Sequence, residues 1–217
     1  LAARIDPGDD VCGFFPGHGP WSSPMRDYLA DGWRTLAELM LLLERAGTAL
    51  VHCSTVLEFA SGHGRFTRHL VKALGAERVT VSDVVPGAVA FSMAHFGVEG
   101  LLSTAEPEDI VWPRRYDLVF VLSLFSHLPQ VSWSRWLARV WQAVAPGGRL
   151  VFSTHGEYAA KRAGVTLDAQ GFHFVADSES SAIDAQQYGT AYTSADFVRT
   201  QLAACAPDGV GCQIAPA

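Results

Sequence analysis

The sequence predicts an α/β protein with a doubly wound, mostly parallel sheet and helices on both sides. Short apolar runs alternate along the chain with segments of helical period, as in a sheet whose strands are joined by helices. The apolar runs are continuous, which is typical of strands buried on both faces. A glycine-rich turn, SGHG at 61–64, follows the first run. With 217 residues and 49% hydrophobic content, the chain is long enough for one well-buried domain.

Residues 1–24 are rich in Gly, Pro and Asp and are predicted to form an arm without a long regular element. Its aromatic residues Phe14, Phe15 and Trp21 suggest that the arm docks on an apolar surface. Residues 25–46 follow with apolar side chains three and four positions apart, which predicts a helix.

From residue 55 onward, the alternation itself defines the elements. The apolar runs predict strands, and the segments of period 3.6 between them predict helices. The predicted strands are 55–59, 79–81, 101–102, 118–122 and 150–152, and the predicted helices are 66–74, 88–96 and 133–144.

The sequence predicts a shortened strand hairpin at the C-terminal end of the sheet. Residues 172–176 can serve as one arm, a helix is expected at 194–205, and only residues 210–214 remain for the other arm. Gly211 interrupts that last segment, and glycine weakens a strand. A very short last strand would leave a sheet edge on which a second copy could pair, forming a homodimer.

Composition excludes several classes of function. The chain has 16 Lys and Arg against 22 Asp and Glu, a net charge of −6, which argues against nucleic acid as a partner. No stretch has the pattern of a signal peptide or a membrane span, so no membrane partner is expected. The four cysteines lack a close pairing pattern, and we expect reduced thiols and a cytoplasmic location. No metal is expected, because histidines and carboxylates never fall into a ligand-like cluster.

The stretch VLEFASGHGRF (56–66) is the clearest functional signal. Its glycines let the chain turn sharply, and the free amide groups of the following helix face the turn, which suits a ligand with an anionic group. A dinucleotide fingerprint would have a third glycine where this chain has Thr67, and a phosphate P-loop would need Gly-Lys-Ser/Thr. Both phosphate-binding interpretations are weakened.

The pattern Glu58-x-Ala60-x-Gly62-x-Gly64 resembles the first motif of the class I S-adenosylmethionine-dependent methyltransferases, normally Asp/Glu-x-Gly-x-Gly-x-Gly. The resemblance continues in order through VTVSD, STAEPEDI, YDLVFVLSLFSHLP and VAPGGRLVFSTH, and covers roughly residues 52–155. It implies a Rossmann-like fold, methyltransferase activity and S-adenosylmethionine as cofactor.

The resemblance also implies roles for single residues. Glu58 would lie near the methionine ammonium group of the cofactor, and Asp83 would accept hydrogen bonds from both ribose hydroxyls. Glu58 in an ion pair or as a helix-cap partner, and Asp83 as the cap of the helix that starts near Pro86, are the alternatives. The other cofactor-binding residues implied lie in the turn, after the second and third strands, and after the fourth: Ala60, Ser61, Gly62, Gly64, Val84, Thr104, Ala105 and Ser123.

Two departures from the family pattern stand out. Ala60 replaces the first motif glycine, and Thr104 replaces the frequent Asp before alanine, keeping only a hydroxyl for the adenine amino group. Cofactor affinity is therefore expected to be modest. His63, between the two glycines, either reaches the ligand or is solvated.

Methyl transfer is an in-line displacement, so alignment of the two reactants supplies much of the rate. For a hydroxyl acceptor a general base helps, and His127 and His155 are the candidates near the strand ends, as bases or substrate contacts. The alternative is that each is a structural histidine held by hydrogen bonds.

Specificity for the methyl acceptor is expected to come from the segments outside the cofactor motifs. We expect residues 1–50 to form an arm and helix covering the substrate side, and residues 51–217 to form the cofactor-binding methyltransferase domain. His173, Tyr188 and Tyr192 offer polar tips on a second wall, and favour a small polar, sugar-like acceptor. Two other interpretations stay open: a non-catalytic cofactor-binding or partner-binding domain of the same fold, and a nucleotide-dependent oxidoreductase.

Overall fold

The computed structural model describes residues 2–15, 23–177, 184–206 and 210–215. They divide into two compact units. The first unit contains the described residues up to Ala105, together with Tyr116–Phe120 and Ala145–Val151. The second contains Glu106–Arg115, Val121–Val144 and the described residues from Phe152 onward.

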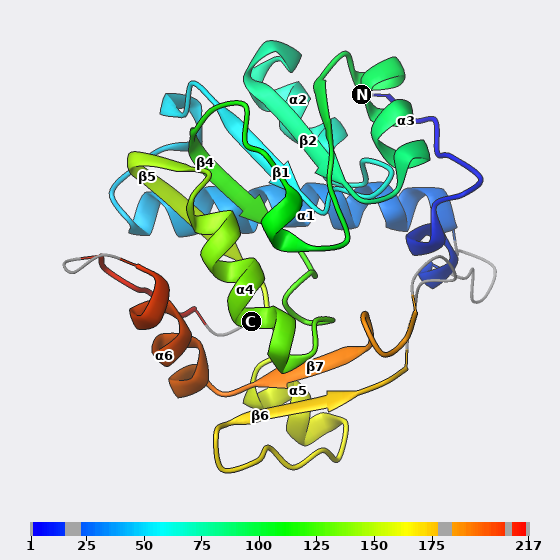
Figure 1. The fold of residues 1–217 in the computed structure, drawn as a ribbon. Helices are drawn as coiled ribbons and strands as arrows, with labels where there is room; N and C mark the ends of the chain where they lie inside the picture. The colour runs from blue at the N-terminus through cyan, green and yellow to red at the C-terminus, as the bar shows by residue number, and fades with distance from the viewer. Residues whose placement is uncertain (1, 16–22, 178–183, 207–209, 216–217) are drawn as a thin grey trace. The chain divides into compact units, whose positions relative to one another are not determined.

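A five-stranded sheet in the order β3-β2-β1-β4-β5 forms the centre of the first unit (Figure 1). The register of β1, β2 and β3 is parallel, with Val56 beside Val79 and Thr80 beside Glu99. After β3 the chain returns to the other side of β1, so the strand order reverses between β1 and β4. Ligands of such sheets bind beyond the carboxyl ends of the strands at this reversal. The strands are β1 (Val56–Phe59), β2 (Val79–Asp83), β3 (Glu99–Leu102), β4 (Tyr116–Val121) and β5 (Val144–Phe152).

Three helices belong to the first unit: α1 (Pro24–Arg45), α2 (Thr67–Leu74) and α3 (Pro86–Phe96). Helix α1 begins where the Ser23 side chain accepts a hydrogen bond from the amide of Arg26 and proline occupies the first turn. Its buried face carries Tyr28, Leu36, Leu39 and Leu43. Helix α2 packs on α1, α3 and β2, and α3 packs on β2 and β3. Short 3₁₀ helices are η1 (Asp10–Phe14), η2 (Leu50–His52) and η3 (Ala76–Arg78).

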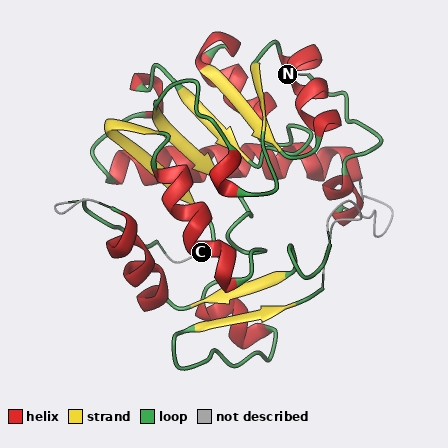
Figure 2. Ribbon diagram, in the orientation of Figure 1, coloured by secondary structure: helices red, strands yellow, loops and turns green. Residues whose placement is uncertain are grey.

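The second unit contains a separate antiparallel pair of strands, β6 and β7, drawn in yellow in Figure 2. Helices α4 and α6 pack together around aromatic side chains, with the rings of Trp133 and Phe197 5.2 Å apart between centroids. Its elements are η4 (Pro107–Asp109), α4 (Gln130–Trp141), α5 (Glu157–Arg162), β6 (Phe172–Val175), β7 (Thr190–Thr193) and α6 (Ala195–Cys205).

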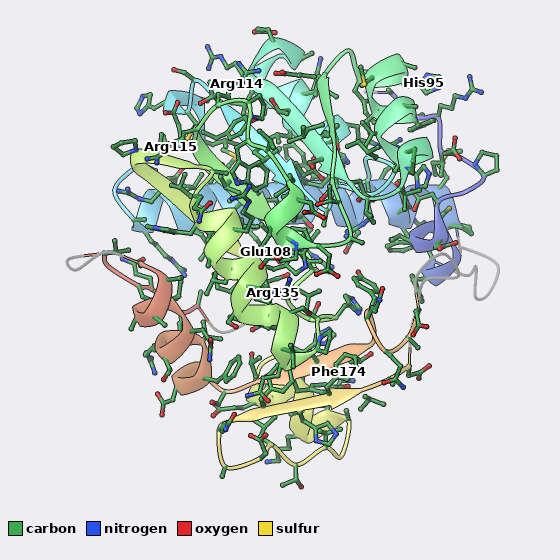
Figure 3. All side chains as sticks on the ribbon, viewed as in Figure 1. His95, Glu108, Arg114, Arg115, Arg135 and Phe174 are labelled. Carbon is green, nitrogen blue, oxygen red and sulfur yellow. The ribbon has the colours of Figure 1, made fainter. Side chains whose placement is uncertain are left out.

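An ion cluster links η4 to α4 in this unit. Arg135 of α4 donates to the carboxylates of Glu108 and Glu106, with its Nε 2.9 Å from Oε1 of Glu108 (Figure 3). These side chains are exposed, so their attraction is screened by water and adds little stability.

The predicted α/β fold with a mostly parallel sheet is confirmed, and the main corrections concern the C-terminal part. The prediction of a strand at 210–214 is wrong, since residues 210–215 form neither strand nor helix. Strand β6 pairs instead with β7, which the sequence analysis did not predict, and this hairpin is not part of the five-stranded sheet. The fourth predicted helix starts and ends three residues earlier than expected, because Pro129 precedes its first turn and Val144 already belongs to β5.

The arm has no long regular element in its described part, where η1 is its one element. Phe15 packs edge-on against Tyr28 of α1, as the prediction of an apolar docking surface requires, while Trp21 lies outside the described residues. All four cysteines are unpaired. None of the helices in the described ranges combines the length and apolarity that crossing a membrane demands.

Candidate functional site

The turn after β1 is built from residues in the left-handed backbone region. Ala60, Gly62 and Gly64 have φ values of 57°, 54° and 81°. A Cβ added at Gly64 would lie 2.2 Å from the ring of Phe96, whereas one added at Gly62 would meet no atom within 4 Å. Gly64 is thus required for packing, and Gly62 leaves a stretch of backbone open to a ligand.

Glu58, on β1, is a buried carboxyl group with 3% of its surface exposed. Its Oε2 accepts a hydrogen bond of 2.6 Å from Oγ1 of Thr67, the first residue of α2. No Lys, Arg or His among the described residues forms an ion pair with it. Burial raises the pKa of Glu58 to about 8, the Thr67 hydroxyl opposes this rise, and the negative charge of Asp83 adds to it.

Asp83, the last residue of β2, connects the two strand ends. Its Oδ2 accepts a hydrogen bond of 2.8 Å from the amide of Gly62, and its Oδ1 one of 2.9 Å from the amide of Val85. Burial raises the pKa of Asp83, and the two amide donors oppose the rise. Each oxygen keeps a lone pair for a further donor. Asp83 therefore contacts the start of α3, as its alternative role as a helix cap implies. Its carboxylate can still accept hydrogen bonds from a ligand.

The remaining predicted residues of the first unit follow the carboxyl ends of β1, β2 and β3. Ser61 is buried and its amide donates to the carbonyl of Ser82, while Val84 is 39% exposed. Thr104 and Ala105 come after Ser103, whose amide donates to the carbonyl of Asp83. Asp83 thus connects the open turn, through its carboxyl group, with the residue that follows β3, through its carbonyl.

The N-terminal arm lies close to this turn and is held by hydrogen bonds from Arg68. Nη1 of Arg68 donates to the carbonyl oxygens of Ala2 and Arg4, at 2.9 and 3.0 Å, and its Nε donates to the carbonyl oxygen of Gly64 at 2.9 Å. Nε2 of His63 lies 3.9 Å from Oδ1 of Asp6. The described part of the arm therefore contacts the same residues that form the turn.

His127 belongs to the second unit and is 6% exposed. Its Nδ1 lies 2.7 Å from the carbonyl oxygen of Gly189, and its own carbonyl accepts from the amide of Gly189 at 2.9 Å. Because a carbonyl can only accept, Nδ1 carries a proton, and in the neutral ring the lone pair is then on Nε2. Tyr188 stacks on the ring at 4.6 Å, so this nitrogen is held in one orientation.

His155 lies close to His127, with ring centroids 6.0 Å apart. Its backbone bridges to β7, where its carbonyl accepts from the amide of Thr193 at 2.9 Å, and its ring packs against Tyr192. Ser123, also in this unit, has a φ of 62°, and its amide donates to Oγ of Ser153. Such a strained conformation outside glycine is common at functional sites.

Sequence reasoning missed two residues of the first unit. Thr67 was noted only as the residue in place of a third glycine, yet it is the hydroxyl that binds Glu58. Arg68 carried no motif, because nothing local indicates that a side chain of α2 binds carbonyl groups more than sixty positions earlier in the chain. Across the described ranges, no three His, Cys, Asp or Glu side chains are grouped closely enough to hold a metal ion.

Both the sequence and the fold of the chain are similar to those of known methyltransferases. Residues 56–148 match a family model described as a methyltransferase domain. A curated relative, the malonyl-[acyl-carrier protein] O-methyltransferase of Hahella chejuensis, is 27% identical over 130 residues, which cover 59% of this chain and 44% of that protein. The chain therefore spans less than half the length of this relative.

Two solved structures share the fold. The magnesium protoporphyrin IX methyltransferase (ChlM) of Synechocystis PCC 6803, with bound SAH, superposes with a TM-score of 0.56 at 16% identity, covering 90% of this chain and 82% of that one. A DhpI-SAM-HEP complex superposes with a TM-score of 0.53 at 21% identity, covering 93% and 90%. At these identities the likeness concerns the fold alone.

Proposed function

We propose that the chain is a class I S-adenosylmethionine-dependent methyltransferase that transfers a methyl group from S-adenosylmethionine to a small polar acceptor, in keeping with the match of residues 56–148 to a methyltransferase-domain model. The observation that carries the proposal is the open backbone at Gly62 beside two buried carboxyl groups, one of which lacks a cationic partner among the described residues. A buried carboxylate is costly unless paired, and the ammonium group of this cofactor would supply the missing charge.

The residues present fit the cofactor at each of its ends. Glu58 would hold the ammonium group, Asp83 the two ribose hydroxyls, and the backbone of Gly62 would lie against the ligand. When bound, the cofactor supplies an electrophilic methyl group on a sulfonium. The lining would be completed by residues of the turn and of the other strand ends: Ala60, Ser61, Gly64, Val84, Thr104, Ala105 and Ser123.

We assign His127 and His155 to the acceptor. With its proton on Nδ1, His127 presents Nε2 as an acceptor for the proton of a hydroxyl nucleophile, and His155 would orient the acceptor. Replacement His127→Asn keeps a donor toward the carbonyl of Gly189 and removes the base. We expect kcat to fall about 10²-fold or more while cofactor affinity stays unchanged. An unchanged kcat would make His127 a structural residue.

The wider assignments follow the sequence analysis. Residues 1–50 would cover the substrate side, and the contacts of Asp6 and Arg68 with the turn support this. The tips of His173, Tyr188 and Tyr192 favour a small, sugar-like acceptor. A net charge of −6 disfavours nucleic acid, four unpaired cysteines suit the cytoplasm, and the edge strands β3 and β5 could support a homodimer.

Isothermal titration with S-adenosylmethionine and with S-adenosylhomocysteine tests the proposal, followed by mass analysis of a panel of small acceptors. Binding of both compounds and a product heavier by one methyl group are expected. Binding without transfer to any acceptor would favour the non-catalytic domain, for which the strained Ala60 in the motif is the specific argument. Absence of binding would refute the proposal.

A further inference from the structure

A shallow hollow of about 310 Å³ lies between α5 and β7 in the second unit. It is lined by His155, Ala159, Arg162, Ala163 and Tyr192. This volume is at the low end of the range for small-molecule sites, about 300–1,000 Å³. The hollow therefore has the size for a small molecule or for one group of it.

The α5 side of the hollow combines one long basic side chain with two short ones. Arg162 and the C-cap Ala163 lie three and four positions after Ala159, which places them on the same side of the helix as Ala159. Arg162 is the last residue of α5 and Ala163 is its C-cap, so the guanidinium lies at the C-terminal end of the helix.

Each polar side chain of the hollow can donate a hydrogen bond, the guanidinium only donates, and none of the five lining residues is acidic. No Asp or Glu within the described ranges forms an ion pair with Arg162, and Lys161 precedes it in the chain. The backbone of His155 is paired with β7, and the ring of Tyr192 lies 5.5 Å from that of His155. A guanidinium, an imidazole and a phenol thus line one small space.

We propose that this hollow binds an anionic group, a carboxylate or a phosphate-type oxyanion, and that this group belongs to the methyl acceptor. Arg162 donates to the anion with its planar fork, which matches the oxygens of such groups. Tyr192 and His155 supply further donors and limit the size of the ligand. The assignment to the acceptor rests on the proposed methyltransferase function, while binding of an anion does not.

Titration of the full chain, with and without saturating S-adenosylhomocysteine, by inorganic phosphate, succinate and uncharged succinamide tests the binding. At least one of the two anions is expected to bind about tenfold more tightly than succinamide. The variant Arg162→Gln should lose about fivefold or more of that affinity. The variant Lys161→Gln, which changes the adjacent exposed charge outside the hollow, should stay within about twofold.

The phosphate and succinate arms decide which kind of anion is preferred. Anion affinity no better than that of succinamide, or equal losses in both variants, would overturn the inference. In a methylation panel of small acids and their amides, Arg162→Gln should raise KM for the acid and leave kcat unchanged. Methylation of the amides alone would refute the link to the acceptor. Failure of S-adenosylhomocysteine to bind would refute the proposed function, and the titration without it would still decide the anion site.

Discussion

Glu58 illustrates how much of the chemistry depends on the surroundings of one residue. The residue is 3% exposed, and its carboxyl group accepts a hydrogen bond from a neutral hydroxyl, that of Thr67. Burial therefore favours the protonated form in the absence of a ligand, and the nearby charge of Asp83 acts in the same direction. A cationic ligand would reverse this preference.

The raised pKa predicts a pH dependence of stability. Between about 4.5, the ordinary pKa of Glu, and about 8, the ligand-free folded protein holds a proton on Glu58 that the unfolded chain has lost. The contribution of Glu58 to the free energy of unfolding should therefore fall as pH rises through this window, by up to about 1.4 kcal/mol per unit, and level off above it. Urea unfolding of the parent chain and of Glu58→Gln, compared across this window, measures it. Identical pH slopes for the two proteins would contradict the buried, neutral carboxyl.

The two glycines of the turn are predicted to respond differently to substitution. Gly62→Ala places a Cβ in open space, so only backbone strain of about 1 kcal/mol is expected, together with a large loss of cofactor affinity. Gly64→Ala drives its Cβ into the ring of Phe96 and should destabilise the fold by more than that. Thermal unfolding and cofactor titration of both variants separate the effects. Normal cofactor affinity in Gly62→Ala would remove this backbone from the site.

At the scale of elements, strand β7 organises the second unit. Its amides and those just before it bind the carbonyls of Ser126, His127 and His155, and it pairs with β6 on its other side. Two histidines that are 28 positions apart in the sequence are thereby brought within 6.0 Å of each other. A strand of four residues thus decides the layout of the candidate acceptor site.

The N-terminal arm is held in place by helix α2, through the side chain of Arg68. This side chain is 2% exposed, binds three carbonyl groups, and lies over the rings of Tyr28 and Phe96. Tyr28 in turn donates to Asp9 of the arm at 2.5 Å. The arm and α2 therefore share one buried polar network.

Replacement Arg68→Met keeps most of the volume and removes the donors. Hydrogen bonds to charged groups contribute about 1.5–3 kcal/mol each, so we expect the free energy of unfolding to fall by about 2 kcal/mol or more, and amides of residues 2–12 to exchange faster. Lys72→Met, on the exposed side of the same helix, is the matched control and should change stability by less than about 0.5 kcal/mol. Equal effects of the two replacements, measured by urea unfolding and hydrogen exchange, would show that the arm is not held by Arg68.

In the whole molecule, the candidate cofactor residues other than Ser123 lie in the first unit, and the candidate acceptor residues His127 and His155 lie in the second. The residues from Glu58 to Ala105 lie in the first unit, and His127, His155 and the hollow beside α5 lie in the second. The carboxyl groups and the turn assigned to the cofactor therefore belong to a different packed unit from the two histidines assigned to the acceptor.

This division predicts where a ligand stabilises the protein. Saturation with S-adenosylhomocysteine at about 100 times its Kd should add about 2.7 kcal/mol to the free energy of unfolding. New protection from hydrogen exchange should appear at residues 58–64, 83–85 and 103–105. Exchange measured with and without the ligand tests this, and protection confined to the second unit would place the cofactor elsewhere.

The α/β class, the five strands of the main sheet and the sharp turn at 60–64 followed from the sequence. Each depends on local features: apolar runs buried on both faces, segments of helical period, and glycine where φ is positive. The hairpin partner of β6 did not follow. Residues 190–193 and 210–214 are both short, and only the packed structure shows which of them pairs with 172–175.

For this protein, the sequence by itself determined the fold class and the motif that resembles the methyltransferase family, because both depend on residues that are neighbours in the chain. Only the tertiary structure decided that Glu58 is buried beside Thr67 with a raised pKa, that Gly64 packs on Phe96 while Gly62 stays open, and that Nδ1 of His127 faces the carbonyl of Gly189. These properties come from burial and from contacts between residues far apart in the chain, and such contacts exist only once the chain is packed.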